Sequence, residues 1–422
     1  ISSSFKYSDA EIKAMRDQSD PELYPSIDWQ EVLMKDLTMS EKLSVNVSGG
    51  GKYARYFTAV SFYNQEGQYY INSGPYSWVP SSIGSFGANV NYKRYNFRSN
   101  LDMDITPTTT VSFGIQGNVS DNTEPAEGGS ASIYRDIINA APNAFPVILK
   151  DGRLAGRDGL NNPYNMLTQR GYVKNFSNAL RANLSIDQNL DFITKGLTAK
   201  ITYAYDYGTN AADTRSRGIN FFEPTGRDES GELLATEWNA SSYQDYLSYS
   251  HASSSTRSQY AEATINYSRT FGKHDVGGLA MGFVKDYRYM IQGMDYIKSL
   301  PKRSLGLAGR VTYAYDKRYL LEANIGFNGS ENFAKGNRWG YFPSVSAGWV
   351  LSNEKFMENI TDKISFLKIR ASWGQNGNEN IGAYKYASTY AFGDLGLYSF
   401  NNNKNGGTQG AYPSLLPNND IT

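Results

Sequence analysis

Cysteine is absent from the 422-residue sequence, and histidine occurs only twice, as His251 and His274. Without cysteine the chain can hold neither a disulfide framework nor a thiolate zinc site, and it has no cysteine nucleophile. Neither histidine has an acidic residue or a second histidine at a spacing typical of a metal site, and the sequence contains no Gly-x-Ser-x-Gly motif. We therefore expect no enzyme activity, no metal and no cofactor.

An excess of charge of one sign is also missing, because 41 basic and 41 acidic side chains leave a formal net charge of zero. This balance argues against electrostatic capture of nucleic acid. The sequence has no run of about 18 apolar residues, so it predicts no transmembrane helix. The mean hydropathy of −0.52 does not separate a soluble β-protein from a transmembrane β-barrel, because barrel strands are apolar only at alternate positions.

Tyrosine and glycine are abundant, with 33 and 40 residues, which is typical of many strands joined by glycine-containing turns. Apolar and polar residues alternate over about a dozen segments, and this pattern predicts strands. The segments are 45–48, 55–62, 101–105, 111–116, 180–187, 197–203, 262–267, 279–283, 310–315, 321–327, 345–349 and 367–373. Many approach the 9–11 residues with which a tilted strand crosses a bilayer.

The alternation gives each predicted strand one apolar and one polar face. In a transmembrane barrel the apolar face contacts lipid and the polar face lines an aqueous lumen, whereas a soluble sandwich buries its apolar face. We expect the following charged residues to face the lumen: Arg181, Lys200, Glu262, Arg310, Glu322 and Arg370. Aromatic residues near strand ends are expected to form interfacial girdles, and they include Tyr205, Tyr207, Tyr313, Tyr315, Trp349 and Trp373.

Short and long links alternate along the chain. The short links are 49–52, 106–108, 189–195, 272–275 and 316–318. The long links are 65–85, 117–174, 209–256, 285–301 and 329–340. Tight periplasmic turns alternating with long extracellular loops are typical of outer-membrane barrels, so this pattern favours an all-β antiparallel transmembrane barrel over a sandwich. We expect residues 1–42 to form a loop with short helices and residues 43–422 to form the barrel part.

Two other sequence features could bind a ligand, but each has a simpler interpretation. The stretch Gly49-Gly50-Gly51-Lys52-Tyr53-Ala54 fits a loosened dinucleotide-binding pattern, but a strand follows it where that motif needs a helix, so we interpret it as a hairpin turn. Aromatic residues in the long links could stack on sugar rings or hold peptides, or they could simply pack the loops together. These weak substrate-binding candidates are Tyr76, Trp78, Trp238, Tyr243 and Tyr246.

Several motifs together resemble the SusC/RagA family of TonB-dependent outer-membrane transporters. The most specific block runs from residue 319 to 380 and includes Arg-Trp-Gly-Tyr-Phe-Pro-Ser (338–344) and Leu-Lys-Ile-Arg-Ala-Ser-Trp-Gly (367–374). Further matches lie at 28–30, 45–50, 55–57, 64–67, 319–321, 329–333, 348–349, 376–378 and 418–422. The resemblance covers most of the chain.

The resemblance implies import of a large nutrient, usually an oligosaccharide and sometimes a peptide. It also implies a SusD-like surface lipoprotein, energy delivered through TonB, and contact with outer-membrane lipid. Such a barrel has about 22 strands and a plug, so we expect an internal fragment that lacks the plug, the TonB-contacting box and the C-terminal strands. The alternative that stays open is a soluble or surface β-rich glycan-binding or adhesin module without transport.

Overall fold

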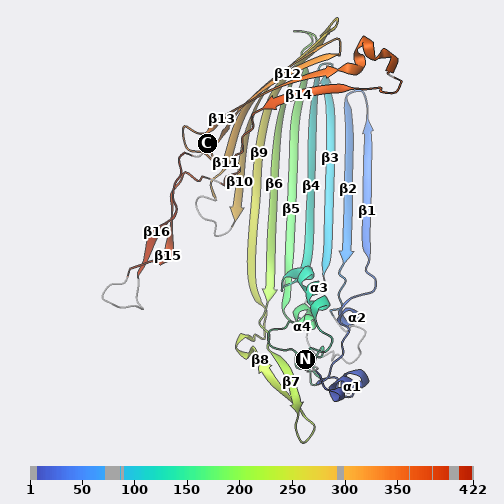
Figure 1. The fold of residues 1–422 in the computed structure, drawn as a ribbon, viewed down its shortest axis with the longest axis vertical. Coiled ribbons are helices and arrows are strands. Elements are labelled where there is room, and N and C mark those ends of the chain that lie inside the picture. Colours follow the sequence, from blue (N-terminus) through green and yellow to red (C-terminus); the bar gives the residue numbers. More distant parts are fainter. Residues whose placement is uncertain are drawn as a thin grey trace.

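The computed structural model describes residues 7–71, 86, 90–291, 299–360, 362–382, 384–398 and 408–420. Its main element is one antiparallel sheet of twelve strands, curved into a wall (Figure 1). In order across the sheet, the strands are β1 (Ser40–Gly50), β2 (Ala54–Glu66), β3 (Asn91–Thr106), β4 (Thr109–Pro125), β5 (Gly171–Asn189), β6 (Leu197–Ser216), β9 (Ser248–Phe271), β10 (His274–Ile291), β11 (Lys302–Tyr315), β12 (Tyr319–Ser330), β13 (Trp339–Val350) and β14 (Lys368–Gly374). The expected barrel wall is confirmed, with β1 and β14 as the edges of the described sheet.

All but one of the alternating segments lie within one of these strands; segment 367–373 starts one residue before β14. Most strands are longer than the alternation suggested. β5 has 19 residues, β6 has 20 and β9 has 24. All three exceed the 9–11 residues needed to cross a bilayer. The outer parts of these strands therefore extend beyond the hydrocarbon region, into stretches that the sequence pattern predicts to be long links.

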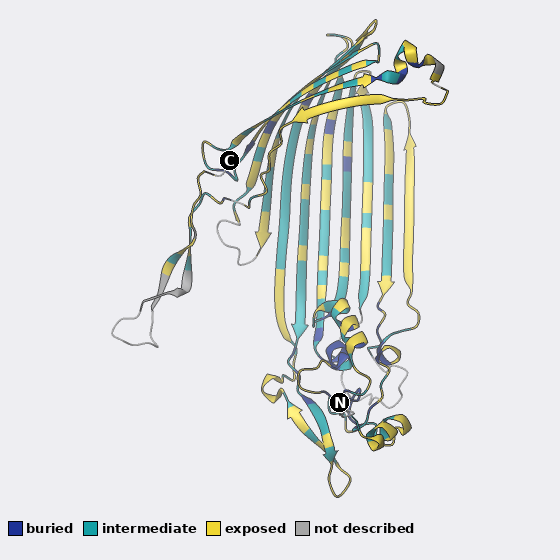
Figure 2. Cartoon of the chain, viewed as in Figure 1, coloured by how far each residue is buried: buried dark blue, intermediate teal, exposed yellow. Residues whose placement is uncertain are grey.

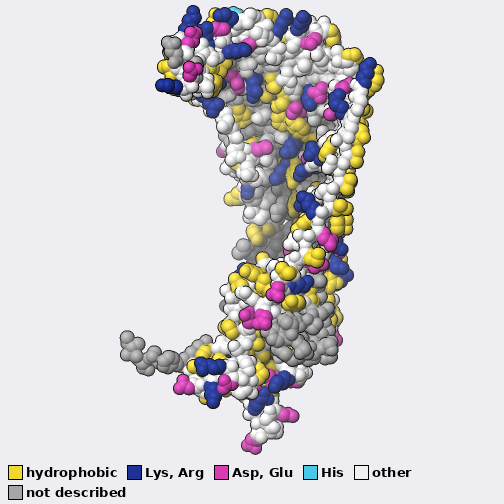
Figure 3. All heavy atoms as spheres, turned by 90° about the vertical axis from the view of Figure 1, so that its right-hand side faces the viewer, with side chains coloured by type: hydrophobic (Ala, Val, Ile, Leu, Met, Phe, Trp, Pro, Cys, Tyr) yellow, Lys and Arg dark blue, Asp and Glu magenta, His cyan; other side chains and the backbone are white. Residues whose placement is uncertain are grey.

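The strand register assigns each side chain to a face, because residues directly opposite each other in an antiparallel pair point to the same side. Ile201 lies opposite Ile186, and Val311 opposite Ala323, so apolar residues share one face. These side chains are open to the surroundings; Val311 is 61% exposed. Hydrophobic side chains line the outer margin of the wall in Figure 3, while charged side chains gather in its hollow.

One part of the two-face prediction is wrong. On β10, Leu279 and Phe283 lie opposite Arg310 and Gly306, which puts them on the polar face, and Met281 follows the same alternation. The apolar side of β10 carries small residues instead. Alternation shows which residues share a face, but it does not show whether that face points to lipid or to the lumen. Phe283 points to the polar face, where its ring packs over Gly306, which has no side chain.

The predicted aromatic girdle is supported at the end of the sheet that carries the short turns. Tyr319 stacks between Tyr315 and Trp349, with ring centroids 6.5 and 6.4 Å apart, and all three residues lie on the apolar face. The β11–β12 turn reverses the chain through two left-handed residues, Asp316 (φ 49°) and Lys317 (φ 54°). Both positive φ values match the turns that suit the twist of antiparallel strands.

Most links on this side are short, as expected. The exception is the β13–β14 link, which holds two 3₁₀ helices, η2 (Leu351–Asn353) and η3 (Lys355–Ile360). Glu354 joins this link to the girdle, since its Oε1 accepts hydrogen bonds from Tyr319 Oη (2.8 Å) and Trp349 Nε1 (3.0 Å).

The opposite end of the wall carries a compact loop cap, which Figure 2 shows as the main concentration of buried residues. Its elements are the helices α1 (Asp9–Asp17), α2 (Trp29–Leu33), α3 (Gly129–Asn139) and α4 (Pro163–Thr168), and the hairpin of β7 (Phe221–Arg227), β8 (Leu233–Trp238) and the 3₁₀ helix η1 (Ala240–Ser242). A second hairpin, β15 (Thr389–Tyr398) and β16 (Thr408–Leu415), forms a separate sheet. No helix in the described part of the chain is long and apolar enough to span a membrane.

The cap has its own hydrophobic core, drawn from segments far apart in the sequence. Leu33 of α2, Ile133 of α3 and Leu167 of α4 are 1%, 0% and 0% exposed. Trp29 packs edge-on against Phe145, with ring centroids 5.6 Å apart. The first 42 residues contain two short helices, α1 and α2, and Ser8 and Glu11 form a capping box at the start of α1.

Candidate transport surface

The polar face of the wall contains all six charged residues predicted to face the lumen. Arg181 lies opposite Asp206 and Lys200 opposite Asp187, both between β5 and β6. The register continues this face to the other four predicted residues: Glu262, Arg310, Glu322 and Arg370. The six residues are distributed over the wall in separate groups, so they form a surface and not one binding site.

Ion pairs link neighbouring strands on this face. Lys200 Nζ lies 3.1 Å from an Asp187 oxygen, and Arg310 Nε lies 3.6 Å from Glu322 Oε1. Arg310 Nε also donates to Asn324 Oδ1 at 2.8 Å. These side chains are 38–54% exposed, so each pair contributes at most about 1 kcal/mol to stability, and their polarity is available to a partner or a solute.

The face holds two recesses. One, of about 410 Å³, is lined by residues of β1 to β5, and its polar lining includes Asn96, Arg98 and Arg181. The other, of about 350 Å³, brings Glu322 and Arg370 together on β12 and β14. Mixed arginine and amide groups of this kind can hydrogen-bond hydroxyl, carbonyl or carboxylate oxygens of a passing solute.

The loop cap holds a third recess, of about 300 Å³, which the sequence did not predict. It is lined by Glu127, Asp158, Asn161, Asn165 and Asn239 together with apolar residues of α4 and β7. The side-chain oxygen of Asn165 is buried there without a hydrogen-bond partner. Sugar hydroxyls or peptide amides would satisfy such a group.

The local sequence explains how the amide groups are held. Asn162 caps α4 by accepting from Tyr164 N (3.0 Å), and Pro163 occupies the first turn of the helix. The Asn162 amide also donates to the carbonyl oxygens of Val147 (3.2 Å) and Ala155 (2.9 Å). The Asn162-Pro163 pair is a helix-start signal that is visible in the sequence.

Arg217 connects the long link 209–256 to the long link 117–174. It is 9% exposed, donates from Nη2 to Gln169 Oε1 at 2.8 Å, and lies with its guanidinium carbon 3.7 Å from the centre of the Phe86 ring. Burial lowers its pKa. A buried arginine with these contacts fixes the cap, because removing it would leave its partners unpaired.

The aromatic residues proposed for substrate binding have different surroundings. Trp238 ends β8 and donates from Nε1 to Glu223 Oε2 at 3.1 Å, while Tyr243 and Tyr246 are 50% and 62% exposed in the link that follows. Tyr76 and Trp78 lie outside the described residues. Substrate contact by these residues stays a prediction.

Arg227 of β7 forms an ion-pair clamp between the segment that joins α1 to α2 and the rest of the loop cap. It donates from Nε and Nη2 to Asp20 at 2.6 and 2.8 Å, and from Nη2 to Glu22 at 2.9 Å. Glu22 in turn accepts from Lys150 N at 2.9 Å. Three segments that are distant in the sequence therefore meet at one charged group.

We expect this clamp to weaken in acid. The hydrogen bonds from Arg227 hold the pKa of the Asp20 carboxyl below its usual value. A carboxyl with a lowered pKa stabilises the folded state above its unfolded pKa of about 3.9, and that contribution disappears as the pH falls through the lowered folded value. The protection factor of the amides in the segment that joins α1 to α2, taken relative to the intrinsic exchange rate at each pH, should therefore fall below about pH 4 and stay constant between pH 5 and 8. An Arg227→Met variant should show faster exchange across the neutral range, and an unchanged rate would contradict the clamp.

Comparisons with known proteins agree with this architecture. The chain is 24% identical over 401 residues to TonB-dependent receptor P39 of Formosa agariphila, covering 86% of this chain and 33% of that protein. It is 39% identical over 94 residues to the TonB-dependent receptor SusC of Bacteroides thetaiotaomicron, covering 22% of this chain and 9% of SusC. Among solved structures, it is similar in fold to a chain of the RagAB peptide transporter, with a TM-score of 0.64 and 18% identity over 98% of this chain and 45% of that chain. No protein-family model matches the sequence.

The chain is SusC/RagA-like. Two independent likenesses, in sequence to TonB-dependent receptors and in fold to the RagAB chain, each extend over most of its length. The resemblance to this family, the partial antiparallel barrel and the outer-membrane location expected from the sequence are therefore confirmed. This SusC/RagA-like chain spans about a third of the length of P39 (33%) and of a second Formosa agariphila receptor, P26 (35%).

Proposed function

We propose that the protein to which this SusC/RagA-like chain belongs imports a large nutrient across the outer membrane. The wall itself is the observation that carries the proposal, because its apolar face suits lipid and its charged face suits an aqueous path. The loop cap would receive the solute on the outer side, and the polar face with its Arg310–Glu322 pair would line the path and contact a plug. The relatives are named as receptors and transporters, which supports the same activity.

The proposed partners follow from the same relatives. We infer a SusD-like surface lipoprotein above the loop cap and energy supplied by TonB at the periplasmic side. The proposed substrate is an oligosaccharide or another glycan, with a peptide as the second possibility. Amide and carboxylate groups in the cap recess fit either substrate, since both present hydroxyl or amide groups.

Co-purification of the complete gene product tests the partnership. The tagged protein would be extracted in mild detergent from washed outer membranes, and its companions identified by mass spectrometry. A stoichiometric surface lipoprotein is the expected result. Recovery from the membrane without a lipoprotein would contradict the pairing, and recovery only in the soluble fraction would favour a glycan-binding or adhesin module instead.

Loop deletions test the role of the cap. We propose that the long links 117–174 and 209–256 contact the lipoprotein and the substrate. The parts of them that lie between strands are residues 126–170, between β4 and β5, and residues 217–247, between β6 and β9. Removing either loop should abolish growth on the substrate while leaving folded protein in the outer membrane. A matched shortening of the turn-side link 351–367 should leave substrate binding intact. Full growth after both loop deletions would overturn the assignment.

Charge reversal tests the polar face. In the complete protein, Arg310→Glu places two carboxylates side by side, and we expect it to disturb plug seating and lower uptake several-fold. Adding Glu322→Arg restores an opposite-charge pair and should recover most of the uptake. Sensitivity to a large antibiotic that the outer membrane normally excludes would report an unseated plug. Equal uptake by the wild type, single variant and double variant would contradict a role for this pair.

A further inference from the structure

A cluster of arginines lies on the outside of the wall, where the apolar belt ends on the loop side. On β10 and β11 the outward positions change from apolar to charged within two residues: Val284 is followed by Asp286, and Leu305 is preceded by Arg303. Gln259 lies opposite Asp286 and belongs to the same face. In an outer-membrane barrel this is the level of the outer-leaflet headgroups.

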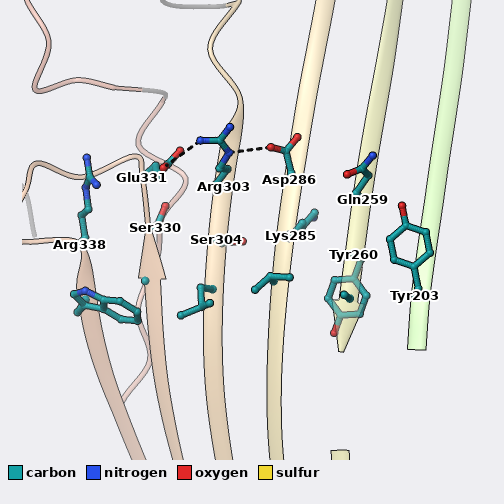
Figure 4. A pocket seen from close by; sticks show the side chains of 15 residues that line it. Tyr203, Gln259, Tyr260, Lys285, Asp286, Arg303, Ser304, Ser330, Glu331 and Arg338 are labelled. Carbon is teal, nitrogen blue, oxygen red and sulfur yellow. Dashed lines mark hydrogen bonds and ion pairs between the residues drawn. The ribbon is translucent and has the colours of Figure 1, made fainter. Parts of the chain in front are cut away.

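Ion pairs hold three arginines around one carboxylate, and we call this group of Arg257, Arg288, Arg303 and Asp286 the arginine shelf. Asp286 lies 2.9 Å from Arg303, 3.2 Å from Arg288 and 4.0 Å from Arg257. Figure 4 shows Arg303 between Asp286 and Glu331, and its Nη1 lies 3.7 Å from Glu331. Arg303 keeps 49% of its side chain exposed and Arg288 keeps 40%, so both have donors available to a ligand.

The shelf has more positive charge than its own carboxylates neutralise. Including Arg338, which lines the same recess, four arginines face two carboxylates, Asp286 and Glu331, and this leaves two positive charges in excess. The Nε of Arg257 is also buried without a hydrogen-bond partner. Guanidinium groups with spare donors are well suited to phosphate oxygens.

An apolar surface continues directly below the arginines. The recess of about 480 Å³ is lined by Tyr203, Val284, Leu305 and Trp339 beneath the charged shelf. These four side chains are 44%, 48%, 40% and 50% exposed, and the register places them on the lipid-facing side. A ligand that fits both parts has an anionic head and an acyl chain.

We propose that this shelf binds a phosphorylated, acylated lipid of the outer leaflet. The phosphate contacts Arg257 and Arg303, and an acyl chain lies along Leu305 and Trp339. A small soluble anion would leave the apolar part unused, and a substrate in transit would pass along the opposite face of the wall. The site therefore serves to anchor the barrel in its membrane, whatever nutrient is carried.

Native mass spectrometry of the complete protein in detergent tests the proposal. The probes are purified lipid A, the same lipid after enzymatic removal of its phosphates, and phosphatidylethanolamine. We expect lipid A to bind at least 10-fold more tightly than the dephosphorylated form, since removing the phosphates removes the charge-assisted hydrogen bonds to the arginines. Inorganic phosphate at millimolar concentration should not displace it. Equal binding of the two lipid forms, or full displacement by phosphate, would overturn the proposal.

Variants locate the site. Arg257→Gln combined with Arg303→Gln should lower lipid A binding at least 10-fold. The matched control is Arg269→Gln, because Arg269 lies on the same strand and the same face but at the turn side of the belt. Glu331→Gln removes a competing carboxylate and should strengthen binding, which separates the site from a general loss of folding. Identical binding by the Arg257/Arg303 and Arg269 variants would overturn the assignment.

Discussion

Replacing Ile201 by arginine in the complete protein should sharply reduce the amount of folded barrel in the outer membrane. Ile201 is 59% exposed, lies opposite Ile186, and is near the middle of the apolar stretch of β6. An arginine facing lipid near the midplane costs about 2–4 kcal/mol. The heat-modifiable folded fraction in outer-membrane preparations and the urea midpoint of the purified protein would measure the loss.

The matched control is the next residue. Thr202 lies opposite Glu262 on the polar face, so Thr202→Arg adds a charge beside a carboxylate and should change the folded fraction little. Both variants introduce the same large side chain, so the difference between their folded fractions measures the effect of the face on which the arginine lies. Equal losses for both would show that the two sides of the wall do not differ in their environment.

The second large effect is expected in the loop cap. Ile133 of α3 is fully buried in the cap core, so Ile133→Ala should destabilise the cap by about 2–5 kcal/mol. If the cap opens locally, amide hydrogen exchange in α3 and α4 should accelerate by roughly 30-fold or more. The strands of the wall should keep their protection, because they have their own hydrogen-bonded register.

Ile138 provides the control in the same helix. It is 50% exposed, and Ile138→Ala should change exchange by no more than the small amount typical of surface substitutions. Equal acceleration in both variants would mean that α3 is not held by its buried face.

The wall could be predicted from the sequence because its signal is local. Alternation along β5, β6 and β12 placed the strands and grouped Arg181, Lys200 and Glu322 on one face, as the register confirms. The period of two arises from the pleat itself, so it survives wherever one face is apolar and the other polar. Alternating link lengths then identified the two ends of the sheet.

Other features depend on contacts between distant segments and could not be predicted in the same way. Strand ends beyond the bilayer are polar on both faces, so the outer halves of β6 and β9 looked like loops. On β10, the facing of Phe283 depends on Gly306 of the next strand. The cap core joins α2 to α3 and α4 across about a hundred residues, and no local pattern reveals such packing.

The central claim is that the apolar face of the wall contacts lipid and the polar face contacts water or protein. The most direct test is spin labelling at Val311 and Thr312, adjacent residues on opposite faces of β11, since the chain contributes no cysteine of its own. Labels on Val311→Cys and Thr312→Cys in the reconstituted complete protein would be compared for collisions with oxygen and with a polar nickel chelate. We predict that the label at residue 311 collides more often with oxygen than with the nickel chelate, and that the label at residue 312 shows no such preference for oxygen. The same accessibility at both residues, or the reverse order, would contradict the account.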